Sequence, residues 1–159
     1  MTDVATTAAY FHYAILLGIV ERSAVSSWLD NIIASSPAPP APAVLEAALA
    51  TDDAALVTAL GHLEPTADYG SVKRALFSAA AEAVRKAPAT AAVLCERLYL
   101  IATLHALPVT ELELHLLVGI SDELHLASSG THGSVQSALN EFVGFLVSAG
   151  QPEQRATGA

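Results

Sequence analysis

The chain has 159 residues, of which 53% are hydrophobic and 14% are charged, and its 16 acidic against 7 basic residues give a net charge of −9. This length suits one domain whose core needs neither disulfides nor a structural metal. The negative charge disfavours nucleic acid and anionic membranes and favours cationic partners. Because soluble domains carry about a quarter charged residues, we expect an unusually apolar surface. Two explanations stay open: alanine on solvated helix faces, or a surface for self-association or a partner.

The sequence predicts a cytoplasmic protein. The longest apolar stretch near the start, residues 8–20, is interrupted by His12 and is too short to span a bilayer. Asp3 stands where a signal peptide carries Lys or Arg. The single Cys95 excludes an intramolecular disulfide and is consistent with a reducing compartment.

Helical spacing of apolar residues dominates the chain and predicts an all-α protein with seven to eight helices. The first helix runs from about residue 3 to 17, and Gly18 is its expected stop. Ser23 is the expected cap of the second helix. The proline-rich segment 35–42 then predicts a stiff, non-helical connector.

Further helices are predicted at about 44–49, 52–60, 71–86, 90–107 and 134–147. The helix at 71–86 ends with Arg85 and Lys86 at the negative end of its dipole. The helix at 90–107 is apolar around most of its circumference, which predicts a central position. The residues expected to face inward in the helices at 71–86 and 134–147 are Val72, Leu76, Phe77, Ala80, Val84, Val135, Leu139, Phe142, Val143 and Leu146. The apolar residues around the helix at 90–107 are Leu94, Cys95, Leu98, Leu100, Ile101 and Leu104.

The apolar helix at 90–107 also contains three reactive or charged side chains. Cys95 is expected to be a buried, inert thiol rather than a nucleophile. Glu96 and Arg97 are the only formal charges of this helix. Because a poorly solvated charge needs a partner, we expect Arg97 to form a salt bridge with Asp30 or Glu46.

Residues 110–127 are compatible with two structures. Apolar residues alternate strictly at 110–116 and again at 123–126, which is typical of a β-hairpin. Against a hairpin, Thr110 and Glu113 have the spacing of a helix capping box, and an isolated two-stranded hairpin has little stability. Helix is therefore the preferred prediction, with the hairpin as the alternative.

Together these elements predict a compact bundle or a short stack of helical hairpins, of HEAT-like or orthogonal type. A single helical domain is expected over residues 1–149. The segment 150–159 is expected to be a disordered tail.

The densest group of potential metal ligands lies in the ambiguous region and consists of Glu111, Glu113, His115, Asp122, Glu123 and His125. On a hairpin, Glu113, His115, Glu123 and His125 would share one face and could hold Zn, Fe or Mn. On a helix the two histidines, ten residues apart, point in different directions. If this region is a helix, we therefore expect no metal and no other cofactor.

Other motifs favour a structural interpretation. Residues 116–121 resemble the turn of a helix-turn-helix, but acidic residues follow where phosphate contacts need Lys or Arg, so no DNA binding is expected. The aromatic run at 10–13 favours core packing over a ligand pocket. His62, His105 and His132 lie near predicted helix ends. Phosphate-binding loops, nucleophile elbows, paired cysteines and HExxH are absent, which disfavours an enzyme.

The opening of the chain resembles a group of known proteins. The run 10–20, then 28–30 and the prolines at 39, 40 and 42 are similar to the start of small all-helical bacterial proteins of unknown function, some of which look like immunity proteins that neutralise polymorphic toxins. The resemblance covers about the first third of the chain and rests on ordinary core residues. It implies a partner-binding role and carries over no functional residue.

The sequence thus predicts an acidic, alanine-rich bacterial protein that binds another protein, as an adaptor or an immunity-type inhibitor, through an acidic or apolar surface. Asp52 with Asp53, or Asp122 with Glu123, are the expected contacts to a cationic partner. The apolar surplus is also compatible with a homodimer. Two alternatives stay open: a metal-dependent helical enzyme that uses the cluster at 111–125, and a domain that binds a small apolar ligand beside residues 10–13.

Overall fold

The structure is a computed structural model that describes residues 3–104 and 107–151. Within these residues the chain forms eight α-helices and one short 3-10 helix, with no strand, so the all-α prediction is confirmed. The helices are α1 (Val4–Leu17), α2 (Arg22–Ser35), α3 (Pro42–Ala48), α4 (Asp53–Gly61), α5 (Tyr69–Lys86), α6 (Ala91–Leu104), α7 (Glu111–Ser128) and α8 (Val135–Ala149), with the 3-10 helix at Pro88–Thr90.

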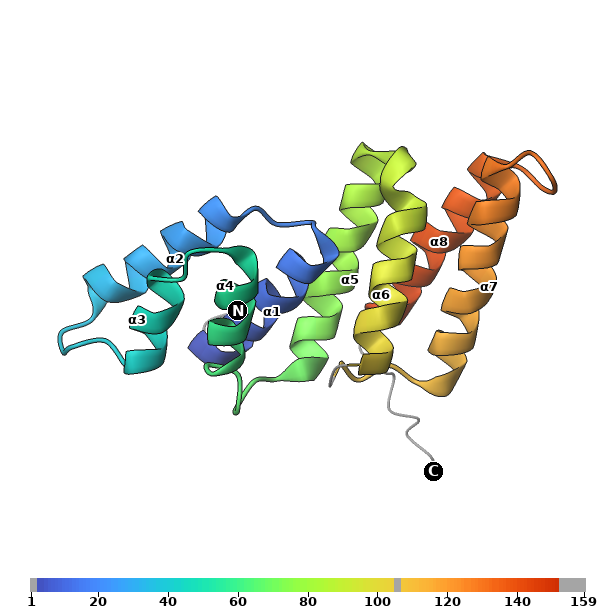
Figure 1. Cartoon of the computed structure of the whole chain (residues 1–159). Helices are drawn as coiled ribbons and strands as arrows, with labels where there is room; N and C mark the ends of the chain where they lie inside the picture. The colour runs from blue at the N-terminus through green and yellow to red at the C-terminus, as the bar shows by residue number, and fades with distance from the viewer. Residues whose placement is uncertain (1–2, 105–106, 152–159) are drawn as a thin grey trace, which may run out of the picture.

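The helices form two packed groups that share α1 (Figure 1). In the first group α1 packs with α2, α3 and α4 around a small core that includes Ala8. In the second group Ala9, Tyr13 and Leu17 of α1 belong to a larger core, in which α1 packs on α5 and α6 and these pack with α7 and α8. The small side chains of Ala8 and Ala9, both fully buried, let neighbouring helices approach α1 closely. The helix α1 therefore links the two cores.

Local capping signals account for most helix ends. The Asp3 carboxylate accepts a hydrogen bond from the Thr6 amide, and Gly18 ends α1 in the left-handed conformation with φ of 73°. Asp52 and Ser134 cap α4 and α8 in the same way as Asp3 caps α1. These ends agree with the sequence to within one or two residues.

Three helix starts differ from the sequence prediction. The helix α3 begins at Pro42, inside the segment predicted to be a non-helical connector, because proline suits the first position of a helix. The helix α2 begins at Arg22, and its cap Glu21 makes no side-chain hydrogen bond, so the prediction of Ser23 as the cap was wrong. The helix α5 begins at Tyr69 rather than near Ser71, because Asp68 accepts hydrogen bonds from two amides of the first turn. An aspartate followed by an aromatic residue and a glycine gave no strong local signal for this start.

The face of α6 that packs inward is narrower than predicted. Its buried residues include Leu94, Cys95, Leu98 and Ile101, but Leu100 and Leu104 are exposed, Leu104 by 74%. Val135 at the start of α8 is exposed as well. The helix α6 packs on α7, α1 and α8, and the exposed Leu100 and Leu104 show that part of its apolar circumference is uncovered.

Arg97 of α6 does not form the expected salt bridge with Asp30 or Glu46. Its guanidinium donates a hydrogen bond to the carbonyl of Leu17, at 3.3 Å, where the last turn of α1 leaves carbonyl groups without helical partners. Glu46 lies instead 3.1 Å from His62 at the surface. The arginine therefore caps a helix end, a role that cations favour at the negative end of the helix dipole.

The last described residues continue from α8. The Gly150 amide donates to the carbonyl of Leu146 at 3.1 Å. The rest of the expected tail, residues 152–159, lies outside the described residues, as does His105. Across the described ranges, no helix combines the length and the apolar character that crossing a membrane requires.

Candidate protein-binding surface

The ambiguous segment at 110–127 is the helix α7, so the hairpin alternative was wrong. The Thr110 hydroxyl accepts a hydrogen bond from the Glu113 amide at 3.2 Å, and the Glu113 carboxylate accepts one from the Thr110 amide at 2.7 Å. This reciprocal capping box satisfies two amides that a helix start leaves without partners. The local capping signal therefore outweighs the alternation of apolar residues.

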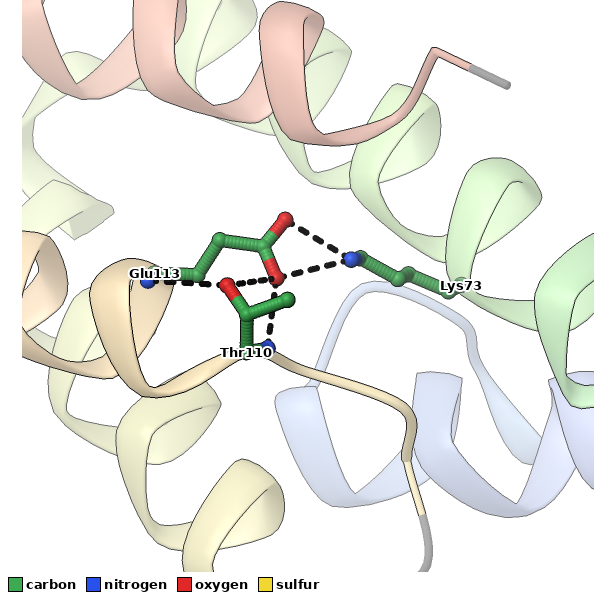
Figure 2. A network of polar contacts seen from close by, with 3 residues as sticks. All are labelled: Lys73, Thr110 and Glu113. Carbon is green, nitrogen blue, oxygen red and sulfur yellow. Dashed lines mark hydrogen bonds and ion pairs between the residues drawn. The ribbon is translucent and has the colours of Figure 1, made fainter. Parts of the chain in front are cut away.

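Glu113 also binds Lys73 of α5 (Figure 2). The ammonium of Lys73 lies 2.7 and 2.9 Å from the two carboxylate oxygens, and both side chains are largely buried. Burial acts to raise the pKa of Glu113, but hydrogen bonds from Lys73 and Thr110 outweigh it and hold that pKa below its usual value. Glu113 thus anchors the first turn of α7 on α5.

The other three proposed metal ligands are not brought together with Glu113. The ring of His115 faces the Glu111 carbonyl at 2.8 Å, Glu123 faces Glu141 of α8, and His125 lies in the last turn of α7. Within residues 3–104 and 107–151, no group of three or more His, Cys, Asp or Glu side chains is placed to hold a metal ion. The expected metal site depended on a hairpin, which would have placed the four side chains on one face.

An apolar groove runs between α7 and α8. Leu112 and Leu116, one turn apart on α7, are 69% and 45% exposed. The groove between them and α8 has a volume of about 450 Å³. Its lining consists of Leu112, Glu113, Leu116, Ile120, Glu141, Gly144, Phe145, Ser148 and Ala149, and we call it the α7–α8 groove.

Two carboxylates face each other across α7 and α8. Glu123 raises the pKa of the exposed Glu141 through a shared hydrogen bond and through charge repulsion. Residues 107–151 contain five acidic residues and no Lys or Arg, so this segment supplies no cation of its own for the pair. The Lys73 ammonium, which comes from α5, is bound to Glu113. The α7–α8 surface is therefore both acidic and apolar.

Two glycines lie in the interior of these helices on exposed faces. A Cβ atom added to Gly119 of α7 or to Gly144 of α8 would meet no other atom within 4 Å. Glycine in a helix interior costs about 1 kcal/mol relative to alanine, so the packing of this chain gives no reason for either residue. Gly144 lines the α7–α8 groove, whereas Gly119 is not part of the groove lining.

A second polar group, missed by the sequence analysis, lies buried at the joint of the two cores. The carboxylate of Glu64, only 6% exposed, pairs with the ring of His12 and accepts a hydrogen bond from the Tyr69 hydroxyl at 3.0 Å. Burial and this contact with Glu64 raise the pKa of Tyr69. Because Glu64 is 52 residues from His12, no local pattern indicated this pairing.

Neighbouring aromatic side chains complete this joint. Tyr13 is almost fully buried and lies with its ring 6.4 Å from that of Tyr69, and Phe11 packs against Trp28. The aromatic run at 10–13 therefore packs in both cores. Its polar contacts tie α1 to the segment between α4 and α5.

Cys95 is buried, as predicted. Its thiol lies 3.6 Å from the Leu117 carbonyl, and burial, with a smaller contribution from Glu96, raises its pKa to about 12. A thiol with this pKa is almost entirely protonated near neutral pH and is a poor nucleophile.

Comparison with known proteins identified no relative. No protein-family model matches the sequence, and no curated protein or solved structure matches it either.

Proposed function

We propose that this protein binds another protein through the α7–α8 surface, and that the partner presents positive charge there. The observation that carries the proposal is the combination of exposed leucines and an uncompensated carboxylate pair on one face. Exposed apolar patches bordered by polar residues are typical of protein interaction sites. Opposite charge on the partner steers its approach and selects against other partners.

The partner is better explained as a different protein than as a second copy. In a twofold-symmetric dimer the same patch lies on both sides of the interface. Contact through the α7–α8 surface would place Glu123 and Glu141 of both copies in one interface, to which residues 107–151 contribute no Lys or Arg. The pKa of Glu141 is already raised within one copy, by its hydrogen bond with Glu123 and by charge repulsion between the two carboxylates. A basic partner relieves this repulsion, whereas a second copy increases it.

Within this proposal the protein acts in the cytoplasm as an adaptor or an immunity-type inhibitor. Both roles need a stable scaffold and a partner surface, and neither needs a catalytic group. The resemblance of the first third of the chain to small bacterial helical proteins, some of them similar to immunity proteins, supports the same class of function. A cationic enzyme or toxin is the kind of partner that a net charge of −9 would attract.

The structure separates the two acidic pairs that the sequence suggested as contacts. Asp52 caps α4, so charge reversal there would also disturb the start of that helix, whereas Asp53 is exposed and lies 3.8 Å from Arg22. Asp122 and Glu123 are exposed on α7. The informative acidic residue for binding is therefore Glu123, beside the groove.

The test is affinity capture from the protein's own host, with the wild type and two charge-reversal variants compared side by side. Glu123→Lys should reduce recovery of a basic partner about tenfold or more, and the loss should resemble the effect of high salt on the wild type. Asp30→Lys, an exposed reversal on α2 with the same change in net charge, is the matched control. Equal loss with both variants would show a general charge effect and contradict a site on α7 and α8.

A further inference from the structure

We propose that the occupant of the α7–α8 groove is an amphipathic helix that carries leucine-like side chains on one face and Lys or Arg beside them. This inference rests on the proposed function and specifies the chemistry of its partner. It depends on the shape of the groove, on Gly144 and on the position of the carboxylate pair of Glu123 and Glu141.

The dimensions of the groove suit two turns of helix. Its α7 wall runs from Leu112 to Ile120, which is about 12 Å at 1.5 Å per residue. Apolar side chains at positions i, i+4 and i+7 of a helix span about the same length. A bound strand is disfavoured, because the described residues contain no sheet edge to which a strand could add.

Gly144 gives the occupant room to approach. Its neighbours along the groove are Phe145 and Ser148 of α8 and Leu116 of α7. With no Cβ at this position, the backbone of an incoming helix can lie closer to α8 than any other residue would permit. The absence of any contact for an added Cβ shows that the free protein does not need this glycine for packing.

The carboxylate pair sets the charge and the orientation of the occupant. Glu141 lines the groove one turn before Phe145, and its neighbour Glu123 comes from α7. A Lys or Arg placed one turn from a leucine on the occupant would reach both carboxylates while the leucine contacts Leu116. Such a cation would be favoured by two nearby carboxylates and would suppress their mutual repulsion.

The experiment uses a synthetic peptide of about 14 residues, or about four helical turns, made of Leu and Lys in helical spacing. Its binding to the full protein is measured by fluorescence anisotropy, and its helicity by circular dichroism. A peptide of the same composition whose order gives no apolar helix face is the control for nonspecific charge attraction. We expect the amphipathic peptide to bind at least tenfold more tightly than this control, to gain helicity on binding and to lose affinity with added salt.

A matched pair of variants locates the binding. Gly144→Leu should weaken peptide binding about tenfold or more by filling the groove, while Gly119→Leu should change it less than about twofold. Both substitutions replace an exposed glycine inside a helix with a good helix former, so both proteins should fold at least as well as the wild type. Equal affinity of the wild type and Gly144→Leu, or of the two peptides, would overturn the inference.

The failure of this inference can be distinguished from failure of the proposed function. If a host partner is captured and lost on Glu123→Lys but the amphipathic peptide neither binds nor competes with it, the surface binds a protein and the helical occupant is wrong. If the peptide binds in the groove and no host protein depends on Glu123, the inference about the groove holds and the proposed function fails.

Discussion

Lys73 and Glu113 join the middle of the molecule to the first turn of α7, with the lysine ammonium within 2.9 Å of both carboxylate oxygens. Because Glu113 also caps α7 through Thr110, one carboxylate fixes both the start of the helix and its position on α5 (Figure 2). The α7–α8 groove begins at this anchor, since Glu113 itself lines it.

Replacing the lysine should therefore destabilise the fold. Lys73→Met leaves the largely buried carboxylate of Glu113 without its cation and should lower the free energy of unfolding by about 1–2 kcal/mol. Urea denaturation measures the change. Arg85→Met is the control, because Arg85 pairs with Glu82 on the exposed face of the same helix and should cost less than about 0.5 kcal/mol. Equal losses of stability in the two variants would show that the Lys73–Glu113 pair stabilises the fold no more than an exposed pair does.

The same pair predicts a dependence of stability on pH. The folded-state pKa of Glu113 lies below its ordinary value of 4.5, so the pair contributes stability above that value and loses it as the pH falls through the folded-state pKa. The wild type should thus lose its advantage over Lys73→Met as the pH is lowered below about 4.5. Urea midpoints of both proteins across this pH range measure the effect. A constant difference in stability down to the lowest pH would contradict this.

Glu141 should show the opposite sign. Its folded-state pKa is raised by Glu123, so the ionised pair opposes folding above that pKa, and the effect vanishes when the pH is low enough to protonate Glu141. Glu141→Gln should therefore raise the melting temperature slightly near neutral pH and leave it unchanged in acid. Thermal melts at the two pH values check this, with Glu111→Gln as a control on the exposed first turn of α7. A lower melting temperature for Glu141→Gln at neutral pH would show that the carboxylate pair stabilises the fold.

Gly144 should be replaceable without harm to the fold. Gly144→Ala should raise the free energy of unfolding by about 0.5–1 kcal/mol, because alanine favours the helix and its Cβ meets nothing beyond its chain neighbours and the backbone of its own helix. Denaturant titration of the single variant is sufficient. Destabilisation would mean that the glycine serves packing inside the chain, which would remove one of the three supports for a helical occupant.

The buried polar group at the joint of the cores should act as a unit. Tyr69→Phe removes the hydroxyl that donates to Glu64 and should cost about 1 kcal/mol. Glu64→Gln should cost more, because it also changes the contact with His12. The double variant should be less destabilised than the sum of the two, and unfolding measurements on all three give the coupling. Strict additivity would show that the hydroxyl and the carboxylate do not stabilise each other.

The elements that sequence predicts well are those whose signals are local. The capping box of Thr110 and Glu113 and the buried face of α5 depend on residues within a turn or two of each other, and both are present in the structure. The exposure of Leu104 could not be predicted, because an apolar helix position does not show whether a neighbouring helix covers it. The same limit applies to the leucines of the α7–α8 groove.

Contacts between distant segments could not be predicted from the sequence patterns. Lys73 and Glu113 are 40 residues apart and His12 and Glu64 are 52 apart, so only the packing of the helices brings them together. Arg97 illustrates the same point, since its need for a partner was evident but the partner is a helix-end carbonyl rather than a carboxylate. The sequence indicated Glu123 as a candidate contact, but its position beside Glu141 of α8 required the fold.

The most direct test of the account is capture of host proteins by the wild type and by Leu112→Ser combined with Leu116→Ser. The control is Leu45→Ser combined with Leu49→Ser, which removes two exposed leucines with the same spacing, one in α3 and one directly after it, at the opposite end of the molecule (Figure 1). We predict that a basic protein is recovered in stoichiometric amount with the wild type and the control, and is lost with the α7 variant. Recovery of the same proteins in the same amounts by all three, or of no protein with the wild type, would contradict a protein-binding role for the α7–α8 surface.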